Sequence, residues 1–276
     1  MTDPDDGLPV SEVGEWATEK HERLRKYIDI TRAARRKYTD AARSPENRGG
    51  ATYIDLFCGP GRCVVRGTTT VMDGSPLVAT KIAASGGIPF TEIHVADVNS
   101  DFSNSATSRI KALGGNVFGY TGSAEVTAKT IVSQLNPHGL HFAFVDPYNL
   151  EGLTFDTIEQ LSRLKRMDLL LHLSVFDLQR NLERYSASDH SPLDAVAPGW
   201  KSSVDLRQSG PGVRTAYVAY WSSKMKELGF THRGVELVTG SQNQRLYWLV
   251  FLSRSELAND LWDKIRHISG QKSLDL

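Results

Sequence analysis

The stretch YIDLFCGPGRC, residues 53–63, decides the fold class of this chain. Its first five residues are apolar except for Asp55, as in a strand buried inside a parallel sheet. Gly59 and Gly61 follow, and residues without a Cβ let the backbone turn sharply and approach a ligand closely. In open α/β sheets, ligands bind at such turns, at the carboxyl ends of the strands. We therefore expect the loop of Gly59, Pro60 and Gly61 to hold a ligand.

Two common glycine motifs do not match this loop. A dinucleotide-binding fingerprint needs a third glycine at position 64, which is Val64, and a phosphate-binding P-loop needs Gly-Lys-Ser/Thr, which is absent. Asp55 lies just before the loop, where its carboxylate could reach an ammonium group or a water molecule beside the ligand. The alternative is that Asp55 is a charge partner within the sheet. In the string D-L-F-x-G-x-G we favour the ligand-binding interpretation.

Short apolar runs alternate with helical patterns after this loop. Runs of this kind are typical of strands buried within a parallel sheet. Their order predicts a doubly wound, Rossmann-like α/β fold with right-handed crossovers. The expected strands are 51–57, 91–97, 116–120, 140–146 and 167–175, and the expected helices are 76–86, 99–113, 123–135 and 154–165.

The last part of the chain changes character. THRGVELVTG and QRLYWLVFLS, residues 231–240 and 243–252, are joined by a very short turn at 241–242 and should form an antiparallel hairpin. With the five parallel strands they make a mostly parallel, seven-stranded sheet, the layout of S-adenosylmethionine-dependent methyltransferases. Residues 187–212 contain three prolines and many Ser, Asp and Gly residues, which predicts a long loop insert.

The beginning of the chain predicts a helical extension. The first ten residues have the composition of a frayed tail, and a helical pattern then runs from Ser11 to about Ala42. We therefore divide the chain into a tail and basic helix, residues 1–45, and a methyltransferase-like α/β domain, residues 46–276.

This helix carries a local excess of positive charge. Residues 20–37 contain eight Lys and Arg residues against two acids, although the whole chain has 32 basic and 32 acidic residues. The functional interpretation is that Arg32, Arg35 and Arg36 contact nucleic-acid phosphates. The alternative is a solvated helix face that happens to be basic.

An acid also ends the second expected strand. Asp97 closes VAD at residues 95–97, where a carboxylate can accept hydrogen bonds from both hydroxyls of a ribose. Because 36 positions separate Gly61 from Asp97, against a usual spacing of about 20, an extra loop must precede the intervening helix. After the third strand, Ser123 could bind an adenine edge, but it could equally be a helix N-cap.

The fourth expected strand ends in Asp146, Pro147 and Tyr148. In enzymes that methylate exocyclic amines, an Asp or Asn followed by proline and an aromatic residue accepts the N–H groups and stacks on the base. Only one proline is present here, so the match to Asp-Pro-Pro-Tyr is partial. The alternative is a turn that ends the strand.

Composition excludes several other classes. The chain has 276 residues and only two cysteines, Cys58 and Cys63, so it has neither a disulfide framework nor a four-cysteine metal site. We interpret both cysteines as packing thiols. We expect no metal site, because no histidines have the spacing of a helical zinc site. No window reaches the about 18 apolar residues of a membrane span, and we expect a cytoplasmic protein.

Together these motifs resemble the three-Cys-motif partner family, bacterial proteins named for a neighbouring protein that carries three cysteines. The matching segments lie between about residues 19 and 265 and include KHERLRKYI, YIDLFCGPGR, DGSPL, ADVN, FVDPY and LYWLVFLSRS. The resemblance implies a partner of the radical S-adenosylmethionine type. It also implies an S-adenosylmethionine pocket formed by Asp55, Gly59, Pro60, Gly61, Asp97 and Ser123, and a reaction edge at Asp146, Pro147 and Tyr148.

The sequence departs from the family at two places. Cys58 stands where members usually have alanine, and Asn149 stands where glycine is common. The expected function is methyl transfer from S-adenosylmethionine to an amine of a nucleic-acid base, in association with the three-cysteine protein. The alternatives are a protein or small-molecule acceptor, and a non-catalytic, cofactor-binding scaffold for that partner. A restriction-type nuclease is disfavoured because no Asp…Glu-x-Lys cluster is present.

Overall fold

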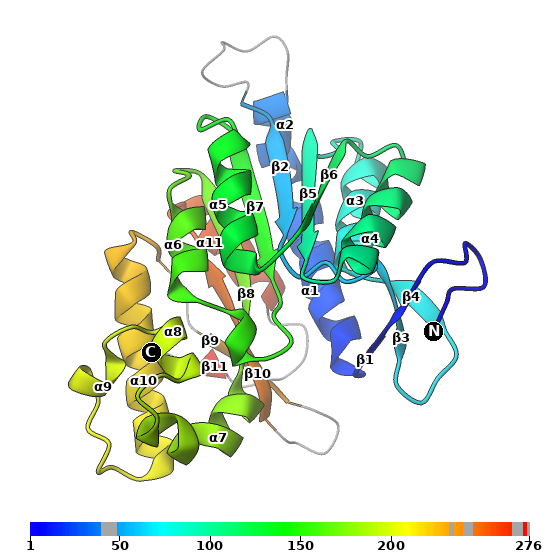
Figure 1. Cartoon of the computed structure of the whole chain (residues 1–276). Coiled ribbons are helices and arrows are strands. Elements are labelled where there is room, and N and C mark those ends of the chain that lie inside the picture. Colours follow the sequence, from blue (N-terminus) through cyan, green and yellow to red (C-terminus); the bar gives the residue numbers. More distant parts are fainter. Residues whose placement is uncertain (40–48, 232–234, 240–244, 267–272, 275–276) are drawn as a thin grey trace.

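The structure is a computed structural model, and it describes residues 1–39, 49–231, 235–239, 245–266 and 273–274. Its centre is an eight-stranded sheet with the strand order β11-β9-β10-β8-β7-β2-β5-β6 (Figure 1). The strands are β2 (Ala51–Asp55), β5 (Glu92–Asp97), β6 (Val117–Thr121), β7 (Leu140–Val145), β8 (Met167–Ser174), β9 (Val235–Thr239), β10 (Arg245–Leu252) and β11 (Ser273–Leu274).

Five strands, β6, β5, β2, β7 and β8, run parallel to one another, as the alternation of strands and helices predicted. The antiparallel pairing of β9 with β10 is also confirmed, and β10 lies antiparallel to β8. The predicted turn of this hairpin, at 241–242, lies outside the described residues. The predicted count of seven strands is wrong by one, because the two-residue strand β11 adds to β9.

Helices cover both faces of the sheet (Figure 1). On one face, the core beneath α1, α3, α4 and α11 contains Tyr53, Phe142 and Phe251. On the other face, the core beneath α5, α6 and α10 contains Ile54 and Trp248. Neighbouring residues of a strand point to opposite faces, which explains why both cores draw on the same strands. The helices are α1 (Trp16–Ile30), α3 (Ser75–Ser85), α4 (Ser100–Ala112), α5 (Ala124–Gln134), α6 (Phe155–Ser162), α10 (Gly210–Glu227) and α11 (Glu256–Arg266).

The predicted single helix from Ser11 to about Ala42 is wrong. The segment begins with strand β1 (Ser11–Val13) and continues as helices α1 and α2 (Arg32–Thr39). The break falls at Thr31, whose hydroxyl donates to the carbonyl of Tyr27 at 2.7 Å and so competes with continued helix formation.

The extra loop predicted after the glycine turn is a β-hairpin. Strands β3 (Arg62–Val65) and β4 (Val71–Asp73) pair with each other, and β1 adds to β3 to form a separate three-stranded sheet. The two ends of the hairpin lie side by side, because the amide of Gly74 donates a hydrogen bond to the carbonyl of Gly61 at 2.8 Å. The glycine turn therefore keeps its place at the start of α3.

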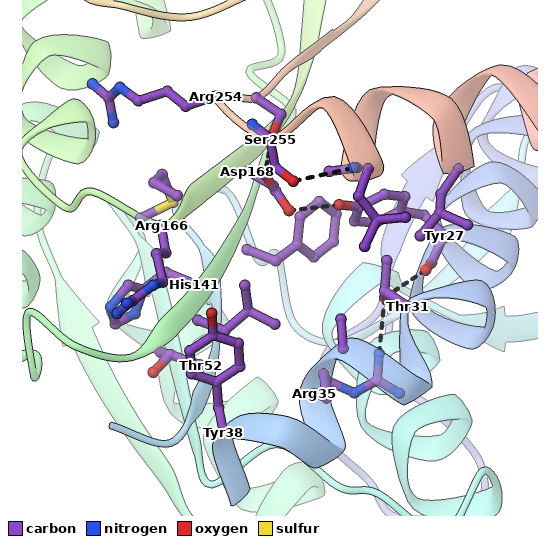
Figure 2. A pocket seen from close by; sticks show the side chains of 18 of the residues that line it. Tyr27, Thr31, Arg35, Tyr38, Thr52, His141, Arg166, Asp168, Arg254 and Ser255 are labelled. Atoms are coloured by element: carbon purple, nitrogen blue, oxygen red, sulfur yellow. Dashed lines mark hydrogen bonds between the residues drawn. The ribbon is translucent and has the colours of Figure 1, made fainter. Parts of the chain in front are cut away.

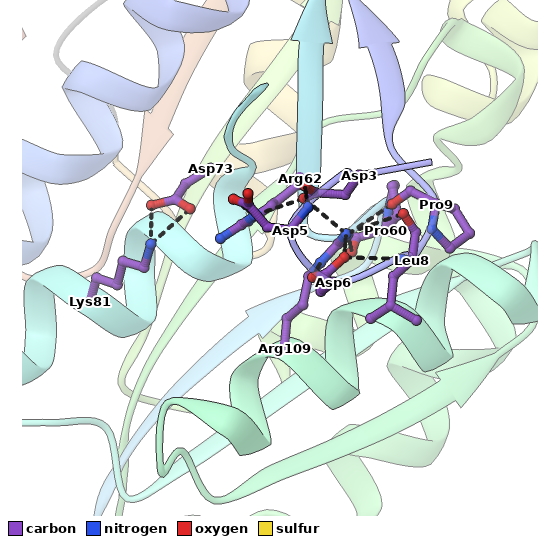
Figure 3. Close-up of polar contacts among 10 residues, drawn as sticks. All are labelled: Asp3, Asp5, Asp6, Leu8, Pro9, Pro60, Arg62, Asp73, Lys81 and Arg109. Carbon is purple, nitrogen blue, oxygen red and sulfur yellow. Dashed lines mark hydrogen bonds and ion pairs between the residues drawn. The ribbon is translucent and has the colours of Figure 1, made fainter. Parts of the chain in front are cut away.

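The first ten residues are fixed by ion pairs, so their description as a frayed tail is wrong (Figure 3). Arg62 donates to Asp3 at 2.7 Å, and Arg109 holds both carboxylate oxygens of Asp6 at 2.7 and 2.8 Å. This bidentate guanidinium lowers the pKa of Asp6 to about 2. The two arginines lie 59 and 103 positions after the acids that they hold. The composition of the first ten residues alone therefore could not predict this role of the acids.

The loop insert predicted at 187–212 is also wrong. Between β8 and α10 the chain forms α7 (Val175–Ala187), α8 (Pro192–Val196) and α9 (Trp200–Ser203). Ser191 and Asp194 form a capping box at the start of α8, and the indole of the fully buried Trp200 donates to Asp194 at 2.8 Å. Prolines at the starts of α8 and α10 occupy a position that favours helix initiation, so the prolines that suggested a loop start helices instead. Within the described residues, no helix has the length and apolar character needed to cross a membrane.

Candidate functional site

The carboxyl edge of the parallel strands brings the predicted site segments together. Asp55 ends β2, Asp97 ends β5, Ser123 follows β6 and Asp146 follows β7. These four strands are neighbours in the order β6-β5-β2-β7. The candidate site therefore draws on four separate segments of the chain.

The glycine turn has a backbone that glycine favours. Gly59 and Gly61 have φ angles of 53° and 88°, in the left-handed region. A Cβ on Gly61 would lie 3.2 Å from the Cα of Ala106 in α4, so the loop also packs closely on that helix. Arg109, from the same helix, donates to the carbonyl of Pro60 at 2.7 Å and holds the turn in place.

Asp97 connects β5 to this turn. Its Oδ2 accepts a hydrogen bond from the amide of Gly59 at 3.1 Å, and its Oδ1 accepts one from the amide of Asn99 at 2.9 Å. The side chain is half-buried at the strand end. An ionised carboxylate has about four acceptor positions, so two remain after these contacts.

Asp55 lies beneath the turn and is fully buried. It accepts hydrogen bonds from Ser75 at 2.6 Å, from Tyr53 at 3.0 Å and from the amide of Phe57 at 3.3 Å. Burial raises the pKa of its carboxyl group to about 7, although all three donors act in the opposite direction. The geometry favours the alternative interpretation, in which Asp55 supports the sheet and loop from within instead of reaching a ligand.

Ser123 is the N-cap of α5. Its hydroxyl accepts from the amide of Val126 at 3.5 Å, and the residue is exposed. This is the alternative given for it from the sequence, and its position after β6 also keeps it at the carboxyl edge.

Asp146 is the centre of a buried polar cluster. The ammonium of Lys20 donates hydrogen bonds to both of its carboxylate oxygens, at 2.6 and 2.5 Å. Its Oδ1 also lies 3.0 Å from Nδ1 of His172. The same nitrogen lies 3.2 Å from the carbonyl of Pro147. Tyr247 closes the cluster, with its ring 5.3 Å from the Lys20 nitrogen and edge-on to His172 at 4.4 Å.

The charges in this cluster follow from its surroundings. Burial is the largest influence on Asp146 and raises its pKa, but Lys20 and His172 outweigh it and hold the pKa well below its usual range. Burial and the neighbouring ammonium lower the pKa of His172. A neutral His172 whose Nδ1 faces two acceptor oxygens must carry its proton there, which leaves Nε2 as the unprotonated nitrogen.

Tyr148 projects from this edge into solvent. It is 96% exposed, whereas the adjacent Pro147 is buried. Asn149 caps the short 3-10 helix η2 (Leu150–Gly152) by accepting from the amide of Gly152 at 3.3 Å. An amide side chain thus fixes the turn after Tyr148.

Sequence reasoning missed Lys20, His172 and Tyr247. Lys20 lies within the basic segment 20–37, and no motif in the sequence singled out His172 or Tyr247. Strand pairing brings two of these residues together. Strands β8 and β10 are neighbours, and Tyr247 pairs with Ser174, which lies two residues after His172. No sequence pattern placed Lys20 beside Asp146.

The three arginines proposed for nucleic acid do not share a surface. Arg32 and Arg36 are exposed, but Arg35 is only 2% exposed and donates to the carbonyls of Ile28 and Ile88. Arg35 is therefore wrong as a contact to nucleic-acid phosphates on the surface, because its side chain is buried in the interior. The amphipathic helix α2 turns Arg35 inward, whereas Arg32 and Arg36 face outward.

Cys58 and Cys63 are both buried and free. Burial raises the pKa of both thiols, that of Cys63 to about 11, so neither has the thiolate character of a nucleophile. Among the described residues, no group of three or more His, Cys, Asp or Glu side chains is arranged to hold a metal ion.

No protein-family model matches this sequence, and no curated protein matches it. Among solved structures, the chain is similar to the DszA carbon methyltransferase, with 14% identity and a TM-score of 0.48, over 87% of this chain and 54% of that one. It is similar to Trm1 from Pyrococcus horikoshii in complex with S-adenosyl-L-methionine, with 8% identity and a TM-score of 0.42, over 90% of this chain and 57% of that one.

A third similar structure is the N-methyltransferase NodS from Bradyrhizobium japonicum in complex with S-adenosyl-l-homocysteine. The identity is 12% and the TM-score 0.43, over 88% of this chain and 89% of NodS. The chain thus spans little more than half the length of the first two proteins and most of the length of the third.

Proposed function

We propose that the protein is an S-adenosylmethionine-dependent methyltransferase whose cofactor lies at the carboxyl edge of β2, β5 and β7. The observation that carries the proposal is the 3.1 Å hydrogen bond from the amide of Gly59 to Asp97. It joins a left-handed glycine turn to an acid at the end of the neighbouring strand, which is the arrangement that binds nucleosides in α/β folds.

The residues at this edge fit an adenosyl group. Asp97 keeps two acceptor positions for the ribose hydroxyls after its contacts with two backbone amides. The space beside Gly59 is open, since a Cβ there would meet only the hydroxyl of Ser11, at 3.7 Å. Gly59, Pro60, Gly61 and Asp97 would hold the adenosyl part, with Ser123 near the base. When bound, S-adenosylmethionine supplies an electrophilic methyl group.

Asp146 then positions an acceptor amine at the reaction edge. Its low pKa keeps it ionised at neutral pH, so it accepts N–H hydrogen bonds but is too weak a base to remove a proton efficiently. The acceptor nitrogen would gain a bond to the methyl carbon as the bond from that carbon to sulfur breaks, which leaves S-adenosylhomocysteine, and it would lose one proton. That proton passes to water.

The proposed acceptor is an amine of a nucleic-acid base. Tyr148 offers an exposed ring next to Asp146, and stacking of a base on such a ring contributes about 1–3 kcal/mol. Arg32 and Arg36 are two exposed cations of α2 that could contact phosphates. We also propose, from the resemblance stated above, that the protein acts with a three-cysteine-motif partner.

One observation favours a second candidate, a non-catalytic cofactor-binding scaffold. Lys20 already engages both oxygens of Asp146, and the Lys20 side chain is nearly buried. An acceptor amine must therefore share or displace an ammonium group before it reaches the carboxylate.

Turnover separates the two candidates. Formation of S-adenosylhomocysteine is measured with RNA, DNA and cell lysate as acceptors, each with and without the three-cysteine protein. We expect turnover with nucleic acid, and loss of at least a hundredfold in Asp146→Ala. A protein that binds the cofactor but shows no turnover in any of these mixtures is a scaffold.

A further inference from the structure

A cavity lies at the opposite edge of the sheet from the site described above. Its volume is about 360 Å³. It is enclosed by the amino ends of β2, β7 and β8 on one side and by α1, α2 and α11 on the other (Figure 2). A volume of this size accommodates a small organic molecule. Nothing in the proposed methyl transfer uses this edge.

Most of the cavity wall is apolar. Four aromatic rings line it, from Tyr27, Tyr38, Phe90 and Phe142, and aliphatic side chains of α11 complete it. Leu257, on α11, is 57% exposed although it also lines the cavity. Walls of this composition suit a planar or ring-sized apolar body.

The wall also contains a buried cation. Arg35 is 2% exposed, and its guanidinium lies 5.0 Å from the centre of the Phe90 ring. Its Nε and Nη1 donate to backbone carbonyls and to Thr31, whereas Nη2 has no hydrogen-bond partner among the described residues. A buried guanidinium without an acidic partner is costly, and an anion beside it in the cavity would offset that cost.

Other charged side chains along the wall are predominantly positive. Lys165 is exposed, and Arg166 lies over the ring of Tyr38, 5.4 Å from its centre. The one acid, Asp168, already accepts hydroxyl hydrogen bonds from Tyr27 at 2.7 Å and from Ser253 at 2.5 Å. The balance of charge therefore favours a negatively charged ligand.

We propose that this amino-edge cavity binds a small organic anion, with its apolar body between the aromatic rings and its acidic group at Arg35. A carboxylate, sulfonate or phosphate beside the guanidinium balances the buried charge of Arg35, and the rings supply the apolar contact. The site is separate from the proposed cofactor edge and does not depend on the proposed function.

The probe is anilinonaphthalene sulfonate, whose fluorescence rises in apolar sites, and the matched control ligand is N-phenylnaphthylamine, which has the same rings without the acidic group. Titration of the folded full-length protein should show one saturable site for the sulfonate and at least tenfold weaker binding of the neutral amine. Absence of a saturable one-to-one site, or equal affinity for both dyes, overturns the proposal.

Two substitutions locate the site. Ala34→Phe fills the cavity from α2 and should weaken sulfonate binding at least tenfold, whereas Ala112→Phe, on the exposed end of α4, should leave it unchanged. If Ala34→Phe does not fold, Leu257→Glu is compared with Leu257→Gln, at an exposed position. The added negative charge should weaken binding more than the neutral amide does. Equal affinity of these two variants contradicts an anion site.

Discussion

Lys20 of helix α1 places its ammonium 2.6 and 2.5 Å from the two carboxylate oxygens of Asp146, which lies 126 positions later in the chain. The pair ties the N-terminal helix to the edge where the proposed acceptor binds. Both side chains are largely shielded, with 7% and 19% of their surfaces exposed. The helix that looked like a nucleic-acid contact in the sequence is thus, at Lys20, part of the candidate reaction edge.

Removal of the Lys20 charge should destabilise the fold. Lys20→Met leaves Asp146 shielded without its main cation, and we expect a loss of about 3 kcal/mol in the free energy of unfolding. The matched control is Lys26→Met on the same helix, where the exposed ion pair with Glu22 should contribute less than about 0.5 kcal/mol. Urea titrations measure both, and equal effects would show that the Lys20–Asp146 pair is energetically unimportant.

The role of Asp146 in transfer is tested by a pair of variants. Asp146→Ala should lower the rate of methyl transfer at least a hundredfold, about 2.7 kcal/mol, with little change in cofactor affinity. Because this variant leaves the Lys20 ammonium buried and unpaired, the double variant Lys20→Met/Asp146→Ala is measured as well. It should recover stability without recovering activity. Normal transfer rates in the double variant would make Asp146 a turn residue only.

Asp55 should make stability depend on pH. Its folded pKa of about 7 exceeds the ordinary value, so between about pH 4 and pH 7 the unfolded chain binds fewer protons than the folded one. The free energy of unfolding contributed by this group therefore falls as pH rises through that interval. Half-buried His21 and buried His141, whose pKa values desolvation lowers to about 4, give the opposite trend.

Comparison with Asp55→Asn isolates the effect of this one group. Denaturant titrations of both proteins at pH 5 and pH 8 should show that the wild type loses about 2–3 kcal/mol relative to the variant over this range. The histidine contributions cancel in the difference. An identical pH dependence in the two proteins would mean that the Asp55 carboxyl group titrates normally.

The exposed part of the basic segment should govern any salt-dependent binding of nucleic acid. Gel shifts with labelled RNA and DNA at rising salt should give a negative slope that becomes shallower by about 2 in Arg32→Ala/Arg36→Ala. Arg25→Ala, at a half-exposed position of α1, is the control and should change the slope less. A slope that is flat in the wild type would leave α2 as a solvated basic face.

The backbone plan could be predicted from sequence because each of its signals is local. The parallel strands are short apolar runs, and the turn after β2 needs glycines for its left-handed φ angles. The helices between β8 and α10 were harder to predict from the sequence, because prolines start helices as readily as they break them. Whether Trp200 is core or surface depends on Asp194 and on packing partners that only the folded chain supplies.

The candidate site was also predictable only in part, because some of its residues are positioned by contacts between segments that are distant in the sequence. Gly59 and Asp97 were found because strand order alone brings adjacent strand ends together. The inward turn of Arg35, the pairing of Lys20 with Asp146 and the enclosure of Asp55 all depend on tertiary contacts between distant segments. In these cases the residue type indicated that the side chain is charged, but it did not indicate which residue the side chain would contact.

Calorimetric titration of S-adenosylmethionine into the wild type and Asp97→Ala tests the central claim most directly. The account predicts one binding site in the wild type and a tenfold to hundredfold weaker site in the variant, the loss of about 1.5–3 kcal/mol expected for hydrogen bonds to a charged group. Urea unfolding of Asp97→Ala verifies that the variant is folded. No heat of binding in the wild type, or the same affinity in a folded variant, would contradict the account.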